Sequence, residues 1–128
     1  MRGVLIMLLS VPLFAFGQCS TGNCENGVGT FVTSEGIYTG EFKDGLPNGV
    51  GVSEYSLGNK YIGEWENGER NGLGLFFSIT GSAWIGKFKS DMPMYSTGRV
   101  LNSDEIEKIK SNDGGITMEE VKKLYQKD

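Results

Sequence analysis

The chain has 128 residues, of which 12 are Lys or Arg and 16 are Asp or Glu, so its formal net charge is −4 at pH 7. It contains no histidine, which excludes the usual histidine-based acid–base sites and the Ser–His and Cys–His arrangements of hydrolases. Because the balance is acidic and no polybasic cluster offsets it, nucleic acids and anionic lipid surfaces are disfavoured as partners.

The first residues predict an export signal. Arg2 precedes an apolar run over residues 4–16, which is too short to span a bilayer comfortably. Ala15-Phe16-Gly17 places small residues at the −3 and −1 positions of a cleavage site before Gln18. We therefore expect residues 1–17 to be a cleavable signal helix and the mature chain to be secreted or periplasmic.

The only two cysteines, Cys19 and Cys24, follow this signal directly. Export and an even count favour a disulfide between them, and a metal pair is the weaker alternative because the chain has no further Cys and no His. A second alternative is a lipoprotein anchored through Cys19, which would leave Cys24 as a free thiol. We expect the disulfide to close a small loop that shields the front of the fold.

A repeat then begins. Residues 38–45, Tyr-Thr-Gly-Glu-Phe-Lys-Asp-Gly, recur 23 residues later as residues 61–68, Tyr-Ile-Gly-Glu-Trp-Glu-Asn-Gly, and a third copy starts at Trp84. A period of this length marks an array in which neighbouring units supply each other's core. Tyr38, Gly40 and Phe42 alternate with polar residues, as in a strand with one packed face, and a Gly- and Pro-containing turn follows. Each unit is therefore predicted to be a β-hairpin.

Aromatic residues and glycines recur together within these units. Of the 20 glycines, 16 lie between Gly22 and Gly98. We infer that each missing side chain leaves room for a ring from the neighbouring hairpin, so that the rings form a row that is the core of the stack. The packing rings are Tyr38, Phe42, Tyr61, Trp65, Trp84 and Phe88, and the repeat glycines are Gly40, Gly49, Gly51, Gly63, Gly72, Gly74 and Gly86.

This pattern resembles the MORN repeat family, whose repeat runs roughly Y-x-G-x-W/F-x-x-G-x-x-x-G-x-G. The resemblance covers roughly residues 22–90, including an upstream half-unit that starts at Gly27. It implies a mostly β fold, a single-layer antiparallel sheet of stacked MORN β-hairpins, which we place at residues 18–98.

The chain departs from the family pattern at a few positions. Ser53 stands where Phe31 and Phe76 carry aromatic rings, so we expect that position to pack poorly. In the third copy, Asp91 replaces a turn glycine, and Tyr95 and Thr97 stand where the earlier units predict glycines. The array is therefore expected to end there.

Residues 99–128 change character, because glycine nearly vanishes and charge rises. Acidic residues after Ser103 favour a helix start, and Thr117-Met118-Glu119-Glu120 is a capping-box pattern that opens a second helix. We expect a short helical hairpin that closes the far end of the sheet.

One stretch of this tail resembles the centre and end of an EF-hand calcium loop. Asp113-Gly114-Gly115-Ile116 and Glu120 fall at matching offsets, but the first ligand position is then Ile109, which cannot bind calcium. Two helices joined by a Gly-rich turn explain the same residues without an ion. No metal site is predicted, and calcium binding between Asp113 and Glu120 remains the open alternative.

The recurring Glu41 and Glu64 invite comparison with the paired carboxylates of glycosidases. They occupy equivalent places on successive units, and Lys87 replaces them in the third copy, so a solvated row is the better interpretation. No Gly-rich segment has the Lys-Ser or Lys-Thr ending of a phosphate-binding loop. We therefore predict no catalytic residue, no cofactor and no small-molecule substrate.

These features predict a non-catalytic protein for protein–protein interaction or scaffolding in the cell envelope or outside the cell, with self-association by edge pairing as one form of it. The alternative is a carbohydrate- or phospholipid-binding module that uses the aromatic face. The MORN family has been linked to membranes, but removing residues 1–17 leaves a net charge of −5, because Arg2 is their only charged residue. We therefore expect no membrane contact unless Cys19 carries a lipid.

Overall fold

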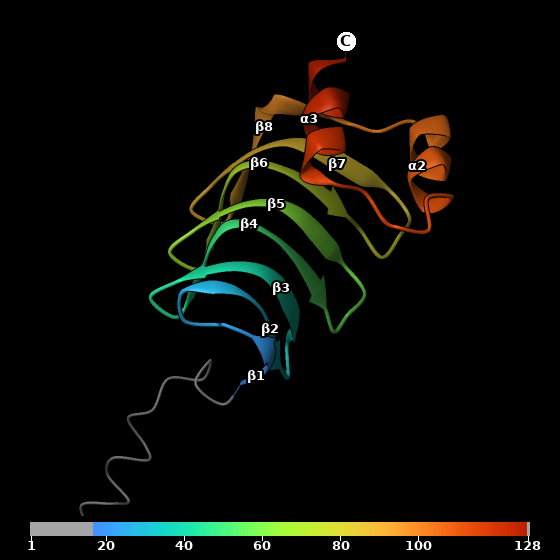
Figure 1. Cartoon of the computed structure of the whole chain (residues 1–128). Helices are drawn as coiled ribbons and strands as arrows, with labels where there is room; N and C mark the ends of the chain where they lie inside the picture. Colours follow the sequence, from blue (N-terminus) through green and yellow to red (C-terminus); the bar gives the residue numbers. More distant parts are fainter. Residues whose placement is uncertain (1–16, 128) are drawn as a thin grey trace, which may run out of the picture.

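The computed structural model describes residues 17–127. Eight strands form one antiparallel sheet in which every strand pairs with its neighbours in chain order. In Figure 1 they stack as a row of bowed arches. The strands are β1 (Gln18–Gly22), β2 (Gly27–Thr33), β3 (Gly36–Lys43), β4 (Leu46–Tyr55), β5 (Lys60–Glu66), β6 (Glu69–Phe77), β7 (Ala83–Lys89) and β8 (Met92–Val100). The expected sheet of antiparallel hairpins is confirmed, whereas the signal prediction falls on residues outside the described ones, apart from Gly17.

Three of the hairpins close through two-residue turns in which both residues have positive φ. Asp44 and Gly45 have φ values of 51° and 80°, and Asn67 and Gly68 have 49° and 83°. Such turns match the right-handed twist of the flanking strands, which explains the Asp-Gly and Asn-Gly pairs. The third turn contains no glycine. Asp91 adopts a φ of 70° there, and its carboxylate accepts a hydrogen bond from the Arg70 N–H at 2.8 Å.

A line of glycines crosses the sheet. Gly22 pairs with Gly29 and Gly29 with Gly40, and the same pairing continues through Gly51, Gly63, Gly74 and Gly86. In the hairpins β3–β4, β5–β6 and β7–β8 the register shifts directly beside this line. Such irregularities bend strands, in keeping with the bowed form of the sheet.

Two helices follow the sheet, α2 (Ser103–Lys110) and α3 (Met118–Gln126). Both begin with capping boxes, in which Asn102 pairs with Glu105 and Thr117 with Glu120. None of the helices within residues 17–127 is long and apolar enough to cross a membrane.

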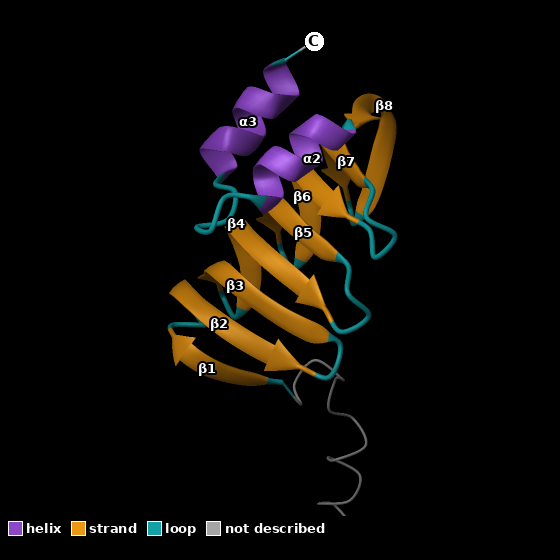
Figure 2. Cartoon of the chain, turned by 90° about the vertical axis from the view of Figure 1, so that its right-hand side faces the viewer, coloured by secondary structure: helices purple, strands orange, loops and turns teal. Residues whose placement is uncertain are grey.

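The helices do not close the far end of the sheet as expected, because α3 packs on a face, against β5, β6 and β7 (Figure 2). The reason lies in the strand residues that point away from the rings. In the later units this second face carries Ile62, Leu75 and Ile85, which are buried with Val121 of α3 in one apolar cluster. The exposed Thr39 occupies the same position in the earlier unit.

The salt bridge of Arg99 holds this helical layer to the last strand. Its guanidinium donates to both oxygens of the buried Glu105 carboxylate, at 3.0 and 2.9 Å, and also to the Leu124 carbonyl at 3.2 Å. The Arg99 partner and the backbone N–H of Asn102 lower the pKa of Glu105 to about 2. The Tyr125 hydroxyl donates to the Thr97 carbonyl at 2.9 Å, so both helices are tied to β8.

Candidate interaction site

The face of the sheet opposite the helices carries a continuous aromatic row. Neighbouring centroids lie between 4.9 and 6.5 Å apart, and all seven pairs are edge-to-face. Such pairs contribute roughly 0.5–1.5 kcal/mol each beyond their buried area. In order along the sheet, the aromatic row is Phe31, Phe42, Tyr38, Trp65, Tyr61, Phe88, Trp84 and Tyr95.

Most of the predicted packing rings are buried in this row. Tyr38, Phe42, Tyr61, Trp65 and Phe88 form one buried cluster, and Trp84 is half-buried against it. Trp65 also donates its indole N–H to the Gly51 carbonyl of the preceding hairpin at 3.2 Å. The aromatic row is therefore the packed core on this face of the sheet, and some of its rings also line the surface.

The glycines make room for rings, but the ring comes from the same hairpin and not from its neighbour. A Cβ at Gly51 would lie 2.1 Å from the Tyr38 hydroxyl, and one at Gly74 would lie 2.3 Å from Tyr61 Cε1. The rings of Tyr38 and Tyr61 thus lie along their own strand and over the paired glycine. Their hydroxyls donate to the carbonyls of Glu41 at 2.8 Å and Glu64 at 3.0 Å.

Burial raises the pKa of Tyr38 and that of Tyr61 above the usual phenol value. Both hydroxyls therefore remain protonated donors at every physiological pH, which keeps the rings anchored to the strand.

The remaining predicted repeat glycines, Gly49 and Gly72, lie in the register shifts. Their φ values are 103° and 101°, a region that favours glycine. Beside them, the Glu41 carboxylate accepts a hydrogen bond from the Val50 N–H, and Glu64 accepts one from the Leu73 N–H at 2.7 Å.

These contacts give the recurring carboxylates a structural role that the repeat pattern did not reveal. Each satisfies a backbone N–H that the sheet leaves unpaired at the shift. In the last hairpin, where Lys87 replaces Glu, the Thr97 hydroxyl accepts from the Lys87 N–H at 2.9 Å.

A groove of about 1030 Å³ lies over the first part of the aromatic row. Its floor includes Tyr38, Ser53 and Trp65, and its lining reaches Arg70 and Asp91 toward the later strands. The Arg70 guanidinium lies over the rings of Tyr61, Phe76 and Phe88, with Cζ 5.7, 6.0 and 5.3 Å from the centroids. This groove is the candidate interaction site.

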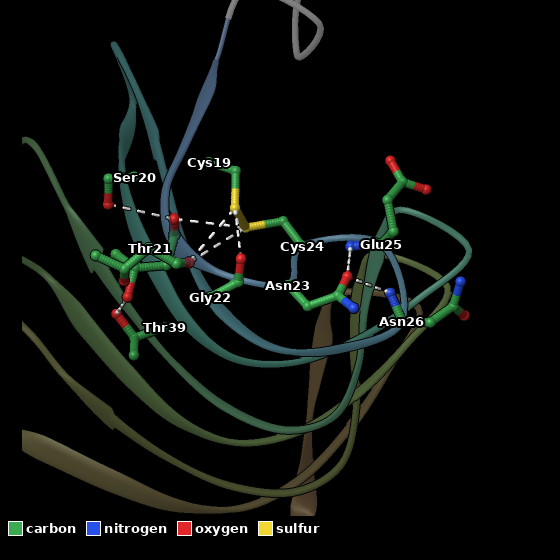
Figure 3. Close-up of a disulfide and its surroundings, with 10 residues drawn as sticks. Cys19, Ser20, Thr21, Gly22, Asn23, Cys24, Glu25, Asn26 and Thr39 are labelled. Carbon is green, nitrogen blue, oxygen red and sulfur yellow. Dashed lines mark hydrogen bonds between the residues drawn. A yellow bond between two sulfur atoms is a disulfide. The ribbon is translucent and has the colours of Figure 1, made fainter.

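Figure 3 shows the disulfide, and both of its cysteines line the groove. Cys19 and Cys24 are joined with their Cα atoms 5.9 Å apart. Cys19 is on β1 opposite Phe31, and Cys24 packs against the ring cluster. The Asn23 side chain accepts from the backbone N–H groups of Glu25 and Asn26, both at 3.0 Å, which fixes the turn. The bridge is thus part of the first hairpin and not of a loop ahead of it.

The stretch that resembles a calcium loop is organised as a helix cap. Glu120 Oε2 accepts from the Thr117 N–H at 2.7 Å and from its hydroxyl at 3.0 Å, and these hydrogen bonds lower the pKa of Glu120. Within residues 17–127, no cluster of three or more acidic, Cys or His side chains has the geometry of a metal site. The Glu120 carboxylate is instead occupied by the N–H and hydroxyl of Thr117.

Sequence reasoning missed Arg70, Tyr95 and Gly98. Pro47 and Gly51 are separated by the same interval as Arg70 and Gly74, but Pro93 and Gly98 are one residue further apart. That insertion moves the expected glycine from 97 to 98, where a Cβ would lie 2.4 Å from Trp84 Cζ2. The departures in the third copy therefore mark a hairpin, β7–β8, whose pattern is shifted by one residue. Tyr95 adds the last ring to the aromatic row, so the array does not end at these departures.

Stacked hairpin units with one shared aromatic core define a β-repeat protein whose elongated surface is suited to contacts with other molecules. The MORN repeat family matches residues 38–60 and 61–83, the two complete units. The chain is a MORN repeat protein. MORN repeats are in general modules for interaction with proteins or membranes, and the family is typically non-enzymatic. No curated protein matches the chain with significant similarity.

Proposed function

We propose that this chain is an exported, non-catalytic interaction protein that binds a segment of a partner protein in the groove of its aromatic face, in the cell envelope or outside the cell. The groove of about 1030 Å³ carries this proposal. It combines apolar rings with a few charged groups in a concave site, as binding sites generally do.

The aromatic face suits a protein segment better than a sugar. Sugars stack on flat, exposed ring faces, but here each ring presents its edge to the face of the next. Tyr61 is 0% exposed and Trp65 is 8% exposed, so neither offers the broad flat face on which a whole sugar ring stacks. An apolar side chain that reaches between the rings is the better match for this surface.

The charge of the chain also weighs against the phospholipid alternative. The net charge of −4 repels anionic headgroups. A protein partner can instead place a few complementary charges at the rim of the groove.

Export is supported by two independent features. Residues 4–16 have the length and flanks of a signal sequence, and the Cys19–Cys24 disulfide suits an oxidising compartment. A lipid on Cys19 would consume the thiol that forms this bridge. Mass spectrometry of the mature chain tests this part: we expect an N-terminus at Gln18 with the disulfide intact, and a lipidated Cys19 would contradict it.

The binding part is tested by capture of partners from envelope extracts with matched variants. Ser53→Phe places a ring in the floor of the groove, whereas Ser82→Phe adds the same ring in an exposed turn between β6 and β7. We expect one partner to be retained by the wild type and by Ser82→Phe and lost by Ser53→Phe. Equal retention by both variants would show that the groove is not the site.

A further inference from the structure

Two consecutive repeats differ in how the space above their rings is filled. In the repeat 61–83, Arg70 lies over Tyr61, Phe76 and Phe88, and its guanidinium donates to the Asp91 carbonyl at 2.8 Å and to Asp91 Oδ1 at 3.3 Å. The chain thus places a cation on its own aromatic row and holds it with an acidic residue of the next turn.

One repeat earlier, the equivalent space lacks these groups and is part of the groove, which Tyr55 also lines. At 23 residues before Arg70, Phe76 and Asp91 stand Pro47, Ser53 and Gly68, which supply no cation, no ring and no carboxylate. The rings equivalent to Tyr61 and Phe88 are Tyr38 and Trp65, and both line the groove. Pro47, Ser53 and Gly68 also line it. The groove therefore includes the place where this repeat lacks the residues that fill the same place in the next repeat.

The charges around this open space favour a cation. Of the four charged residues that line the groove, Arg70 is already paired with Asp91. The other two are Glu25 and Glu35, and neither carboxylate forms a salt bridge within residues 17–127. The groove thus presents two negative charges without a cation of its own.

We propose that the space above Tyr38, Ser53 and Trp65 binds an arginine side chain of the partner segment, accompanied by an aromatic side chain. The guanidinium takes the place that Arg70 takes in the next repeat, and the partner's ring takes the place of Phe76. Glu25 and Glu35 supply the opposite charge. This inference rests on the proposed function, because it names the chemistry of the segment that the groove receives.

The first test uses the protein purified from cells that express the full chain. The probe is the synthetic blocked peptide acetyl-Ser-Phe-Ser-Arg-Ser-amide. A matched peptide carries citrulline, which keeps the shape of arginine without its charge. Titration followed by tryptophan fluorescence and calorimetry should show affinity for the arginine peptide about 10-fold above that for the citrulline peptide, the factor that ~1.4 kcal/mol of cation–ring attraction gives. Equal affinities would overturn the proposal.

The second test fills the space from within. The variant Pro47→Arg/Ser53→Phe/Gly68→Asp rebuilds in the first repeat the residues that fill the second, and it leaves the net charge unchanged. We expect it to lose the peptide and to unfold at a higher temperature than the wild type. A folded variant that still binds the arginine peptide with unchanged affinity contradicts the proposal.

A charge test remains informative if the filled variant does not fold. Glu25→Gln/Glu35→Gln should weaken binding of the arginine peptide several-fold and leave the citrulline peptide unaffected. Glu54→Gln/Glu66→Gln removes the same charge from exposed positions outside the groove and should change neither affinity. Equal weakening by the two double variants would assign the effect to net charge and overturn the assignment to the groove.

The two proposals fail in different ways. If both peptides bind equally and Ser53→Phe still loses the captured partner, the groove is the interaction site but arginine is not its ligand. If Ser53→Phe keeps every partner while the arginine peptide alone binds the wild-type groove, the inferred chemistry stands and the proposed function is wrong.

Discussion

The glycines beneath the rings lie so close to the ring atoms that any other residue would place its Cβ in a steric clash. Tyr61 is fully buried, and its ring closes over Gly74 on the paired strand. Because the ring is held by neighbouring rings on both sides, it cannot move aside for an added methyl group. The glycines are therefore part of the core packing, in addition to shaping the strands.

Gly74→Ala should destabilise the protein by about 1–3 kcal/mol or more, because its Cβ would lie 2.3 Å from Tyr61 Cε1. The control is Gly114→Ala in the turn between the helices, where the nearest heavy atom would be Asn112 Oδ1 at 3.7 Å. This change should stay within about 0.5 kcal/mol of the wild type. Urea unfolding measures both, and similar small effects would contradict tight packing of ring on glycine.

At the scale of single residues, the sequence predicts which residues belong to the packed core but not which of them are in contact. A period shows that rings and glycines belong together, yet it gives no side-chain direction, so it does not show that each ring covers a glycine of its own hairpin. The roles of Glu41 and Glu64 depend on a register shift that only the paired strands reveal. Arg70 is a single departure from the pattern, and its three ring contacts come from three strands.

At the scale of elements, the helical layer makes the two halves of the sheet unlike each other. The second face of the later strands is apolar and covered, whereas β3 exposes Thr39, Glu41 and Lys43 there. The two helices and their caps follow from the sequence, because capping boxes are local signals. Their position on a face does not follow, because it depends on the apolar residues Ile62, Leu75 and Ile85, and the repeat pattern does not show that a helix covers them.

The Arg99–Glu105 contact that fixes this layer should make its attachment depend on pH. The pKa of Glu105 lies at about 2 in the folded chain, below its usual 4.5. Its contribution is therefore complete above about pH 4.5 and is lost as the pH falls from there toward 2.

Glu105→Gln should cost about 1–3 kcal/mol at pH 7, since a buried hydrogen-bonded charge is lost. The difference from the wild type should shrink as the pH approaches 2. Glu107→Gln, at an exposed position on the same helix, is the control and should follow the wild type throughout. Thermal unfolding across this range provides the measurement, and a Glu105→Gln deficit that is independent of pH would contradict the assignment.

On the scale of the whole molecule, the chain combines a periodic sheet with two unlike ends. The disulfide-bridged hairpin closes one end, and the helical layer covers a face near the other. Between them, each unit contacts only its neighbours, so the sheet should tolerate the loss of a whole unit in register. The line of paired glycines defines that register.

Deletion of residues 38–60 should leave a folded protein. It joins Ile37 to Tyr61, so that β2 meets β5 as it now meets β3, with Gly29 opposite Gly63 and Phe31 opposite Tyr61. The helices keep their contacts with β5, β6 and β7. The dependence of the unfolding free energy on urea should fall by roughly a fifth, the share of the described chain that is removed.

Deletion of residues 38–61 differs by one residue and provides the matched control. It joins Ile37 to Ile62, so the strand that follows begins with its alternation reversed and directs its rings to the helical face. We expect this variant to lose the cooperative unfolding transition and the near-ultraviolet signal of packed aromatic rings, while the deletion of residues 38–60 keeps both. If the two deletions behaved alike, folding of the sheet would not depend on register between glycines and rings, and the repeat architecture would not be what stabilises this chain.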